Sequence, residues 1–169
     1  MTGLCFVDAN VFVYARDPRD ARKQARAVSW IEHLWQEQLG RTSAQVLSEF
    51  YAVATRKLAG HVPPDAAWDD VVRYLAWRPM AVDAALMLRA RGIEQRYKLS
   101  WWDSMVVAAA QLQDCDLLLT EDLQDGMVFG TVTVRSPFKL AVEEPRAEYV
   151  FARPAPAHRP RGRPRRAAA

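Results

Sequence analysis

Apolar residues alternate along the chain between short continuous runs and longer stretches with helical spacing. The runs at residues 4–8, 116–120 and 131–134 have the length of buried strands. The longer stretches carry apolar residues three and four positions apart, as helices with one buried face do. They predict helices at residues 21–38, 42–58, 63–75, 84–97 and 100–112. Short strands alternating with helices predict an α/β domain around a mostly parallel sheet.

Turn and capping residues predict where several of these elements begin and end. Thr42 and Gln45 have the spacing of a capping box, so a helix is expected to begin at Thr42. Gly40 is expected to end the helix before it. Pro79 is expected to interrupt a later helix, and residues 80–83 to form a short strand. Residues 11–14 are apolar as well, and turn residues at 16–20 end that run.

The positive charge of the chain is concentrated in its last residues. The 169 residues include 23 Lys+Arg and 20 Asp+Glu, a net charge of +3. Residues 151–169 hold six arginines and no acid, so residues 1–150 carry 17 basic and 20 acidic groups, a balance of −3. A body with this charge does not attract a polyanion through bulk positive charge. It needs a metal ion or a local basic patch to handle one.

The composition changes near residue 148, which predicts a domain at 1–145 and a disordered Arg/Pro-rich tail at 146–169. Residues 160–164 resemble an AT-hook, whose arginines enter the minor groove of DNA. The alternative is loose electrostatic binding of nucleic acid. The candidate nucleic-acid-binding residues of the tail are Arg159, Arg161, Arg163, Arg165 and Arg166.

Cysteine content and hydropathy limit the class of protein. Cys5 and Cys115 lie in or beside apolar runs, which favours buried thiols in a reducing compartment, and the three histidines lack zinc-ligand spacing. No apolar run approaches the ~20 residues that span a bilayer. The N-terminal residues lack the regions of a signal peptide. We therefore expect a cytoplasmic protein without membrane association.

Four acidic residues occupy positions where the fold can bring them together. Asp8 closes the first strand, Glu49 lies beside the apolar stripe of a helix, Asp103 is in the first turn of another helix, and Asp122 follows the strand that ends at Thr120. Ligands of open parallel sheets gather at the carboxyl ends of strands. Converging carboxylates repel each other, and Mg²⁺ and Mn²⁺ prefer such oxygen ligands. Each acid taken alone is equally well a turn, cap or solvated residue, so the residues by themselves do not decide.

Four segments, in order, resemble the motifs of the PIN-domain family, and most closely those of the VapC-type toxins of bacterial toxin–antitoxin pairs. These are Phe6-Val-Asp-Ala-Asn10, Ser48-Glu-Phe50, the Ala-rich helix headed by Asp103, and the closing segments 118–126 and 134–138. The resemblance covers residues 4–138. It implies a three-layer α/β/α fold with a mostly parallel central sheet.

The resemblance also implies an activity, that of a metal-dependent endoribonuclease. By analogy, Asp8, Glu49, Asp103 and Asp122 are the acidic quartet that binds one or two Mg²⁺ or Mn²⁺ ions. An activated water then hydrolyses RNA to 5′-phosphate and 3′-hydroxyl ends. Asn10 and Thr120 would support the acids by hydrogen bonds, and Asp125 would assist. The fourth acid is open among Glu121, Asp122 and Asp125, with Asp122 preferred.

Relatives of this kind pair with themselves and with an antitoxin peptide that blocks the active site. The resemblance therefore implies RNA, a cognate antitoxin protein and a second copy of the chain as partners, with residues 21–38 and 42–58 as the expected contact helices. The main alternative is a catalytically silent PIN-fold adaptor that binds RNA or a protein partner. An aspartyl-phosphate phosphatase is disfavoured, because it would have Asp-x-Asp where this chain has Asp8-Ala-Asn10.

Overall fold

The computed structural model describes residues 3–139. The predicted tail at 146–169, its arginines and the proposed domain boundary at residue 145 lie outside the described residues.

The centre of the fold is a five-stranded sheet with the order β2-β1-β3-β5-β4. The three inner contacts are parallel, and only β4 pairs antiparallel, with β5. In the β1–β3 ladder Val7 lies opposite Leu119, so these two strands end side by side. The mostly parallel sheet predicted from the sequence is therefore confirmed. The strands are β1 (Leu4–Val7), β2 (Gly40–Arg41), β3 (Cys115–Leu119), β4 (Val128–Phe129) and β5 (Val132–Arg135).

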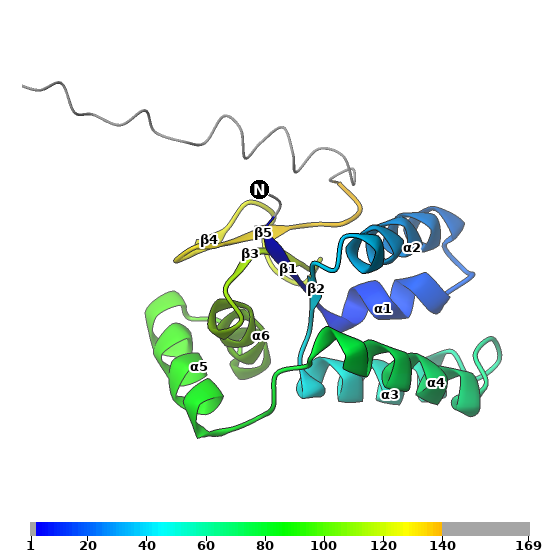
Figure 1. Cartoon of the computed structure of the whole chain (residues 1–169), viewed down its shortest axis with the longest axis horizontal. Helices are drawn as coiled ribbons and strands as arrows, with labels where there is room; N and C mark the ends of the chain where they lie inside the picture. Colours follow the sequence, from blue (N-terminus) through cyan, green and yellow to red (C-terminus); the bar gives the residue numbers. More distant parts are fainter. Residues whose placement is uncertain (1–2, 140–169) are drawn as a thin grey trace, which may run out of the picture.

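Helices flank this sheet in two groups (Figure 1). In one group α6 packs on β3 and β5, and α5 packs on α6. In the other group α1 contacts both α2 and α3, and α4 packs on α3. The helices are α1 (Ala9–Arg16), α2 (Ala21–Gln36), α3 (Ala44–Lys57), α4 (Pro64–Tyr74), α5 (Ala84–Tyr97) and α6 (Trp101–Leu112), with a 3-10 turn at Leu75–Trp77. Across residues 3–139, none of these helices is long and apolar enough to cross a membrane.

A group of aromatic rings holds the first helical group together. The Phe12 ring of α1 lies 4.4 Å from the Tyr74 ring of α4, 5.9 Å from Trp77 and 6.0 Å from Phe50 of α3, centre to centre. All four side chains are buried. Such pairs contribute about 0.5–1.5 kcal/mol each beyond the burial of their surface. They fix α3, and with it Glu49, relative to α1 and the end of β1.

Three elements, α1, β2 and β4, have no counterpart among those expected from the sequence. Residues 9–16 form α1, which buries Val11 and Phe12 and has Asp8 as its N-cap. Two helical turns are too short for a helical period to stand out from a run of apolar residues. The two-residue strands β2 and β4 are likewise too short to leave a pattern.

Two expected boundaries and one expected strand were wrong. The N-cap of α3 is Ser43, whose Oγ accepts from the Val46 amide at 3.2 Å, whereas the Thr42 hydroxyl donates to the Val7 carbonyl at 3.2 Å. The turn after α2 is made by Gln38, with φ of 58°, and Gly40 lies in β2. Residues 80–83 are not a strand, because Met80 forms only an isolated bridge to Ser43.

Gly40 is needed because β2 passes directly over an aromatic ring. A Cβ atom at Gly40 would lie 2.5 Å from Cε2 of Trp77, which is buried. We predict that Gly40→Ala lowers the free energy of unfolding by about 1–3 kcal/mol, because the ring or strand must move. Urea denaturation measures the change. The control is Gly92→Ala in α5, where nothing lies within 4 Å, and it should be neutral or stabilising by about 0.5–1 kcal/mol. Equal stability of Gly40→Ala and the parent chain would refute this packing argument.

Candidate active site

The parallel pairing of β1 and β3 places Asp8 and Thr120 next to each other. Both residues directly follow their strands, and the Asp8 amide donates to the Leu119 carbonyl at 3.1 Å. The Thr120 hydroxyl donates to Oδ2 of Asp8 at 2.7 Å, and the Ala9 amide donates to Oδ1 at 2.7 Å. Asp8 is 7 % exposed and Thr120 is fully buried. The Asp8 carboxylate therefore has a fixed orientation at the end of the sheet.

Asn10 connects this pair to Asp122. Its Nδ2 lies 3.2 Å from Oδ2 of Asp8, 2.9 Å from Oγ1 of Thr120 and 2.9 Å from Oδ2 of Asp122. The Asp122 amide also donates to Oγ1 of Thr120, at 3.1 Å. One side-chain amide and one hydroxyl thus hold two carboxylates close together. Oδ1 of Asn10 is buried and has no hydrogen-bond partner among the described atoms.

Glu49 and Asp103 reach the same region from α3 and α6, one helix of each group. Burial raises the pKa of Glu49, repulsion from the Asp122 and Asp103 carboxylates raises it further, and the positive charge of Lys57 lowers it. Asp103 lies in the first turn of α6, where its amide donates to Oγ of the N-cap Ser100 at 3.1 Å. The Ser100 hydroxyl in turn donates to Oδ2 of Asp103 at 2.6 Å. The carboxylates of Asp103 in α6 and of Asp122 after β3 therefore both repel the Glu49 carboxylate.

The negative charge of the site is not balanced by an ion pair among the described residues, although the charge of Lys57 acts on Glu49. The pKa of Asp8 is raised to about 7, mainly by burial; hydrogen bonds from Thr120 and Ala9 lower it, and the Asp122 and Glu49 carboxylates raise it. Over residues 3–139, no lysine or arginine forms an ion pair with Asp8, Glu49, Asp103 or Asp122. Four mutually repelling carboxylates are an environment that favours a bound cation.

The three acids after β3 have different partners. Glu121 accepts from Nζ of Lys23 at 2.8 Å, which attaches it to α2. Asp125 accepts from the Ser136 amide at 2.8 Å and from Nε of Arg135 at 3.3 Å, which attaches the loop to the end of β5. Asp122 is the one of the three that shares the hydrogen-bond network of Asp8.

Lys23 was not singled out from the sequence. Besides its bonds to Glu121, its Nζ donates to the Tyr14 hydroxyl at 3.1 Å and lies 4.3 Å from the centre of the Tyr14 ring and 4.9 Å from that of Phe138. Lys23 and Glu121 are 98 positions apart, so no local pattern could have paired them. The contact joins α1, α2 and the segments after β3 and β5.

The donor atoms of this site fit a hard divalent cation. Carboxylate oxygens are the ligands that Mg²⁺ and Mn²⁺ prefer, and a cation would offset the unbalanced charge around Asp8. The buried, unpartnered Oδ1 of Asn10 adds a further oxygen acceptor. The carboxylates do not form a closed coordination shell, since no group of three or more His, Cys, Asp or Glu side chains in the described part of the chain is clustered tightly enough to hold a metal.

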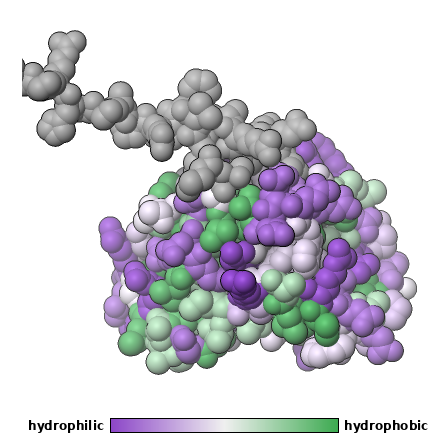
Figure 2. Space-filling model, in the orientation of Figure 1, coloured by the Kyte–Doolittle hydropathy of each residue, from purple (hydrophilic) through white to green (hydrophobic). Residues whose placement is uncertain are grey.

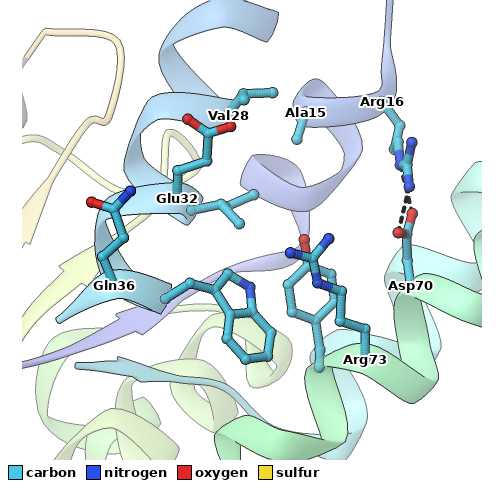
Figure 3. Close-up of a pocket in the computed structure, with 10 residues that line it drawn as sticks. Ala15, Arg16, Val28, Glu32, Gln36, Asp70 and Arg73 are labelled. Atoms are coloured by element: carbon cyan, nitrogen blue, oxygen red, sulfur yellow. Dashed lines mark hydrogen bonds and ion pairs between the residues drawn. The ribbon is translucent and has the colours of Figure 1, made fainter. Parts of the chain in front are cut away.

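A separate groove of about 410 Å³ lies between α1, α2 and α4 (Figure 3). Arg16 and Asp70 both line the groove, and Nε of Arg16 donates to Oδ2 of the buried Asp70 at 2.6 Å. The guanidinium of Arg73 lies 5.2 Å from the centre of the Trp35 ring, and Nε1 of Trp35 is buried with no partner among the described atoms. The groove is therefore lined by two aromatic rings, those of Trp35 and Tyr74, and by charged side chains.

Comparison with known proteins identifies the family to which the fold belongs. The family model described as PIN domain matches residues 5–124, a stretch that includes all four candidate acids. The chain belongs to the PIN domain family. The resemblance inferred from the motifs is thus confirmed at the level of the family.

Among solved structures, the PIN fold of this chain is similar to that of VapC20 from Mycobacterium tuberculosis, described as a sarcin-ricin loop cleaving toxin. The match has 23% sequence identity and a TM-score of 0.53, and it covers 68% of this chain and 86% of that one. At this identity the likeness concerns the fold. No curated protein matches the chain significantly.

The raised pKa of Asp8 predicts a pH-dependent cost to stability. An unfolded aspartate has a pKa near 4, whereas that of Asp8 is about 7, so the folded chain binds more protons between these values and loses stability as the pH rises through them. We predict that Asp8→Asn unfolds with a free energy about 1–3 kcal/mol higher than the parent at pH 8 in EDTA, and that the difference shrinks toward pH 4.

Urea denaturation across this pH range measures the effect. Asp69→Asn, at an exposed position of α4, is the control and should leave the pH profile unchanged. Parallel profiles for the parent chain and Asp8→Asn would contradict the burial and charge repulsion described for Asp8.

Proposed function

We propose that this PIN-domain protein is a metal-dependent endoribonuclease of the VapC type, the toxin of a toxin–antitoxin pair. The observation that carries the proposal is the linked carboxylate pair of Asp8 and Asp122, held by Asn10 and Thr120 without a compensating cation. A purely structural role does not require two such carboxylates side by side. Family membership and the fold shared with VapC20 support the same activity.

In this proposal four residues would bind the cation and three others position them. Asp8, Glu49, Asp103 and Asp122 would hold one or two Mg²⁺ or Mn²⁺ ions. A cation bound there supplies charge neutralisation at the phosphate and acidifies a water molecule. Asn10 and Thr120 orient the carboxylates by donating hydrogen bonds, and Asp125 holds the loop that carries Asp122. Attack of water on phosphorus with cleavage of the bond to O3′, which takes up a proton, leaves a 5′-phosphate and a 3′-hydroxyl.

The proposed toxin acts in the cytoplasm, pairs with a second copy of itself and is silenced by a cognate antitoxin protein. The groove of Figure 3 supports a peptide partner, because it is lined by aromatic rings and charged side chains. Its lining residues come from α1, α2 and α4, so α2, within residues 21–38, stays a proposed contact helix, and the other proposed contact helix, at 42–58, does not line this groove.

A catalytically silent adaptor on the same fold is the second candidate. One observation favours it: within residues 3–139 the acids do not form an assembled cluster of three or more metal ligands. Such an adaptor would bind RNA or a protein partner and would not need Asp8 to ionise.

Cleavage of total RNA by the purified full chain separates the two candidates. We predict products with Mg²⁺ or Mn²⁺, none in EDTA, and a loss of at least about 100-fold in rate for Asp8→Asn, as expected when a cation ligand that stabilises the transition state is removed. Asp69→Asn should keep full activity. Sequencing of the product ends would identify the RNA that is cut. Absence of cleavage with either metal, from folded protein freed of copurifying peptide, would favour the adaptor.

The partners of the acids after β3 give a second prediction. Asp122→Asn should lose at least about 100-fold in cleavage rate, whereas Glu121→Gln, which breaks the ion pair with Lys23, should lose less than about tenfold. Initial rates at saturating metal measure both. The reverse order would assign the fourth acid to Glu121, contrary to this account.

A further inference from the structure

Asp122 is the one candidate acid whose backbone is not fixed by a helix. Glu49 and Asp103 lie within α3 and α6, and Asp8 is the N-cap of α1. Asp122 lies in the segment between β3 and β4, where the described chain has no regular secondary structure. The place of this acid therefore depends on the contacts that attach its loop to neighbouring elements.

The neighbouring carboxylates push Asp122 away from the site. Its charge raises the pKa of both Asp8 and Glu49, so the three carboxylates repel each other. The backbone of α1 fixes Asp8 and that of α3 fixes Glu49, which leaves Asp122 as the acid that can retreat. The side chain of Asn10 opposes this movement with a hydrogen bond of 2.9 Å to Oδ2 of Asp122. A further restraint on the loop would keep the acid in place before a cation arrives.

Lys23 of α2 supplies such a restraint directly before Asp122. Its Nζ donates to Oε2 of Glu121 at 2.8 Å and to Oε1 at 3.2 Å, so the ammonium group contacts both carboxylate oxygens. It also donates to the Tyr14 hydroxyl at 3.1 Å and lies 4.3 Å and 4.9 Å from the centres of the Tyr14 and Phe138 rings. The side chains of Lys23 and Glu121 are 32% and 26% exposed, so water and salt screen this pair less than a fully exposed one.

Asp125 restrains the same loop on the other side of Asp122. Its Oδ1 accepts from the Ser136 amide at 2.8 Å and from Nε of Arg135 at 3.3 Å. Positions 121 and 125 are thus attached to two different elements, α2 and the end of β5. Asp122, which lies between them, forms no ion pair with any residue that the structure describes. The two attached acids hold the loop, and the acid between them keeps its charge for a ligand.

We propose that Lys23 is a positioning residue of the cation site: through Glu121 it holds Asp122 in place against the repulsion of Asp8 and Glu49. This inference rests on the proposed function, because it takes the four acids to bind a divalent cation. A carboxylate that is already in its binding position does not have to be ordered when the cation binds, so the affinity is higher. Lys23 itself contacts neither the cation nor the RNA in this account.

The charge of Lys23 by itself predicts the opposite effect on cation binding. Removal of a positive charge beside a group of carboxylates strengthens the attraction of the site for a cation. Loss of the restraint on Asp122 weakens binding instead. A merely structural role lowers the stability of the chain without changing the affinity of the molecules that are folded. The direction of the change in affinity therefore separates these three roles.

The test is calorimetric titration of the full chain with Mn²⁺, which needs neither RNA nor turnover. Lys23→Met keeps the apolar stem and removes the ammonium group. We expect its Kd for Mn²⁺ to rise about 3- to 10-fold, less than the roughly 10- to 100-fold that is typical when a residue bonded directly to a metal ligand is replaced. Glu121→Gln should raise the Kd at least as much. The double variant should raise it no further than Glu121→Gln alone, because both changes remove the same contact.

Arg22 provides the matched control. It is exposed one position before Lys23 on α2, and Figure 2 shows hydrophilic side chains over the region that this helix occupies in Figure 1. Arg22→Met removes the same charge from the same helix and leaves the contact with Glu121 in place, so the Kd should change less than about twofold. Lys23→Arg keeps a cation beside Glu121 and should stay within about threefold of the parent chain.

Cleavage kinetics give a second readout. The Mn²⁺ concentration that gives half of the maximal rate should rise in Lys23→Met by the same factor as the Kd. The value of kcat at saturating Mn²⁺ should fall less than about tenfold, because Lys23 does not contact the reacting atoms. Circular dichroism at the temperature of the titration shows which variants are folded, and Glu121→Gln carries the test if Lys23→Met is not.

Three results would overturn the inference: a Kd of folded Lys23→Met equal to or below that of the parent chain, an equal rise in Arg22→Met, or a Kd of Asp122→Asn equal to that of the parent. A parent chain that binds no Mn²⁺ would contradict the proposed cation site itself, and the inference with it. Weaker Mn²⁺ binding in Lys23→Met and Glu121→Gln, with parental binding in Arg22→Met, is the result that the inference predicts.

Discussion

The hydrogen bond from Thr120 to Asp8 is the contact on which the site depends. It joins residues 112 positions apart, and it exists because β1 and β3 are parallel neighbours with Val7 opposite Leu119. A shift of the ladder by one residue would turn each side chain to the other face of the sheet. The same hydroxyl accepts hydrogen bonds from Asn10 and from the Asp122 amide, so the orientation of Asp122 follows from that of Thr120.

The electrostatics of the site oppose the stability of the fold. Burial and neighbouring carboxylates raise the pKa values of Asp8 and Glu49, so their ionised forms are held at a cost. The packed rings around Phe12 and the buried face of α6 compensate by fixing the helices that carry Glu49 and Asp103. Such a balance is typical of a site selected for binding a cation rather than for stability.

The sequence predicted those parts of the molecule that local patterns encode. The long helices and the strands carrying Asp8 and Thr120 appear as periodic or continuous apolar runs, and Asp103 appears as part of the cap that Ser100 begins. The two-turn helix α1 is too short to show a helical period. The N-cap of α3 is Ser43 rather than the predicted Thr42, because the Thr42 hydroxyl donates to the backbone of β1.

Contacts between distant segments could not be predicted in the same way. Glu121, Asp122 and Asp125 are indistinguishable as a cluster of turn acids along the chain. Their partners come from α2, α1 and the end of β5, and these partners separate them. The pairing of Lys23 with Glu121 likewise depends on tertiary structure alone.

The central claim is that the acids gathered around Asp8 bind a divalent cation. Anomalous diffraction from crystals of the full chain grown with millimolar Mn²⁺ tests it most directly. The account predicts a manganese peak bonded to Asp8 and to at least one other acid among Glu49, Asp103 and Asp122. A well-ordered site with no manganese at these carboxylates, or with the peak elsewhere on the surface, would contradict it.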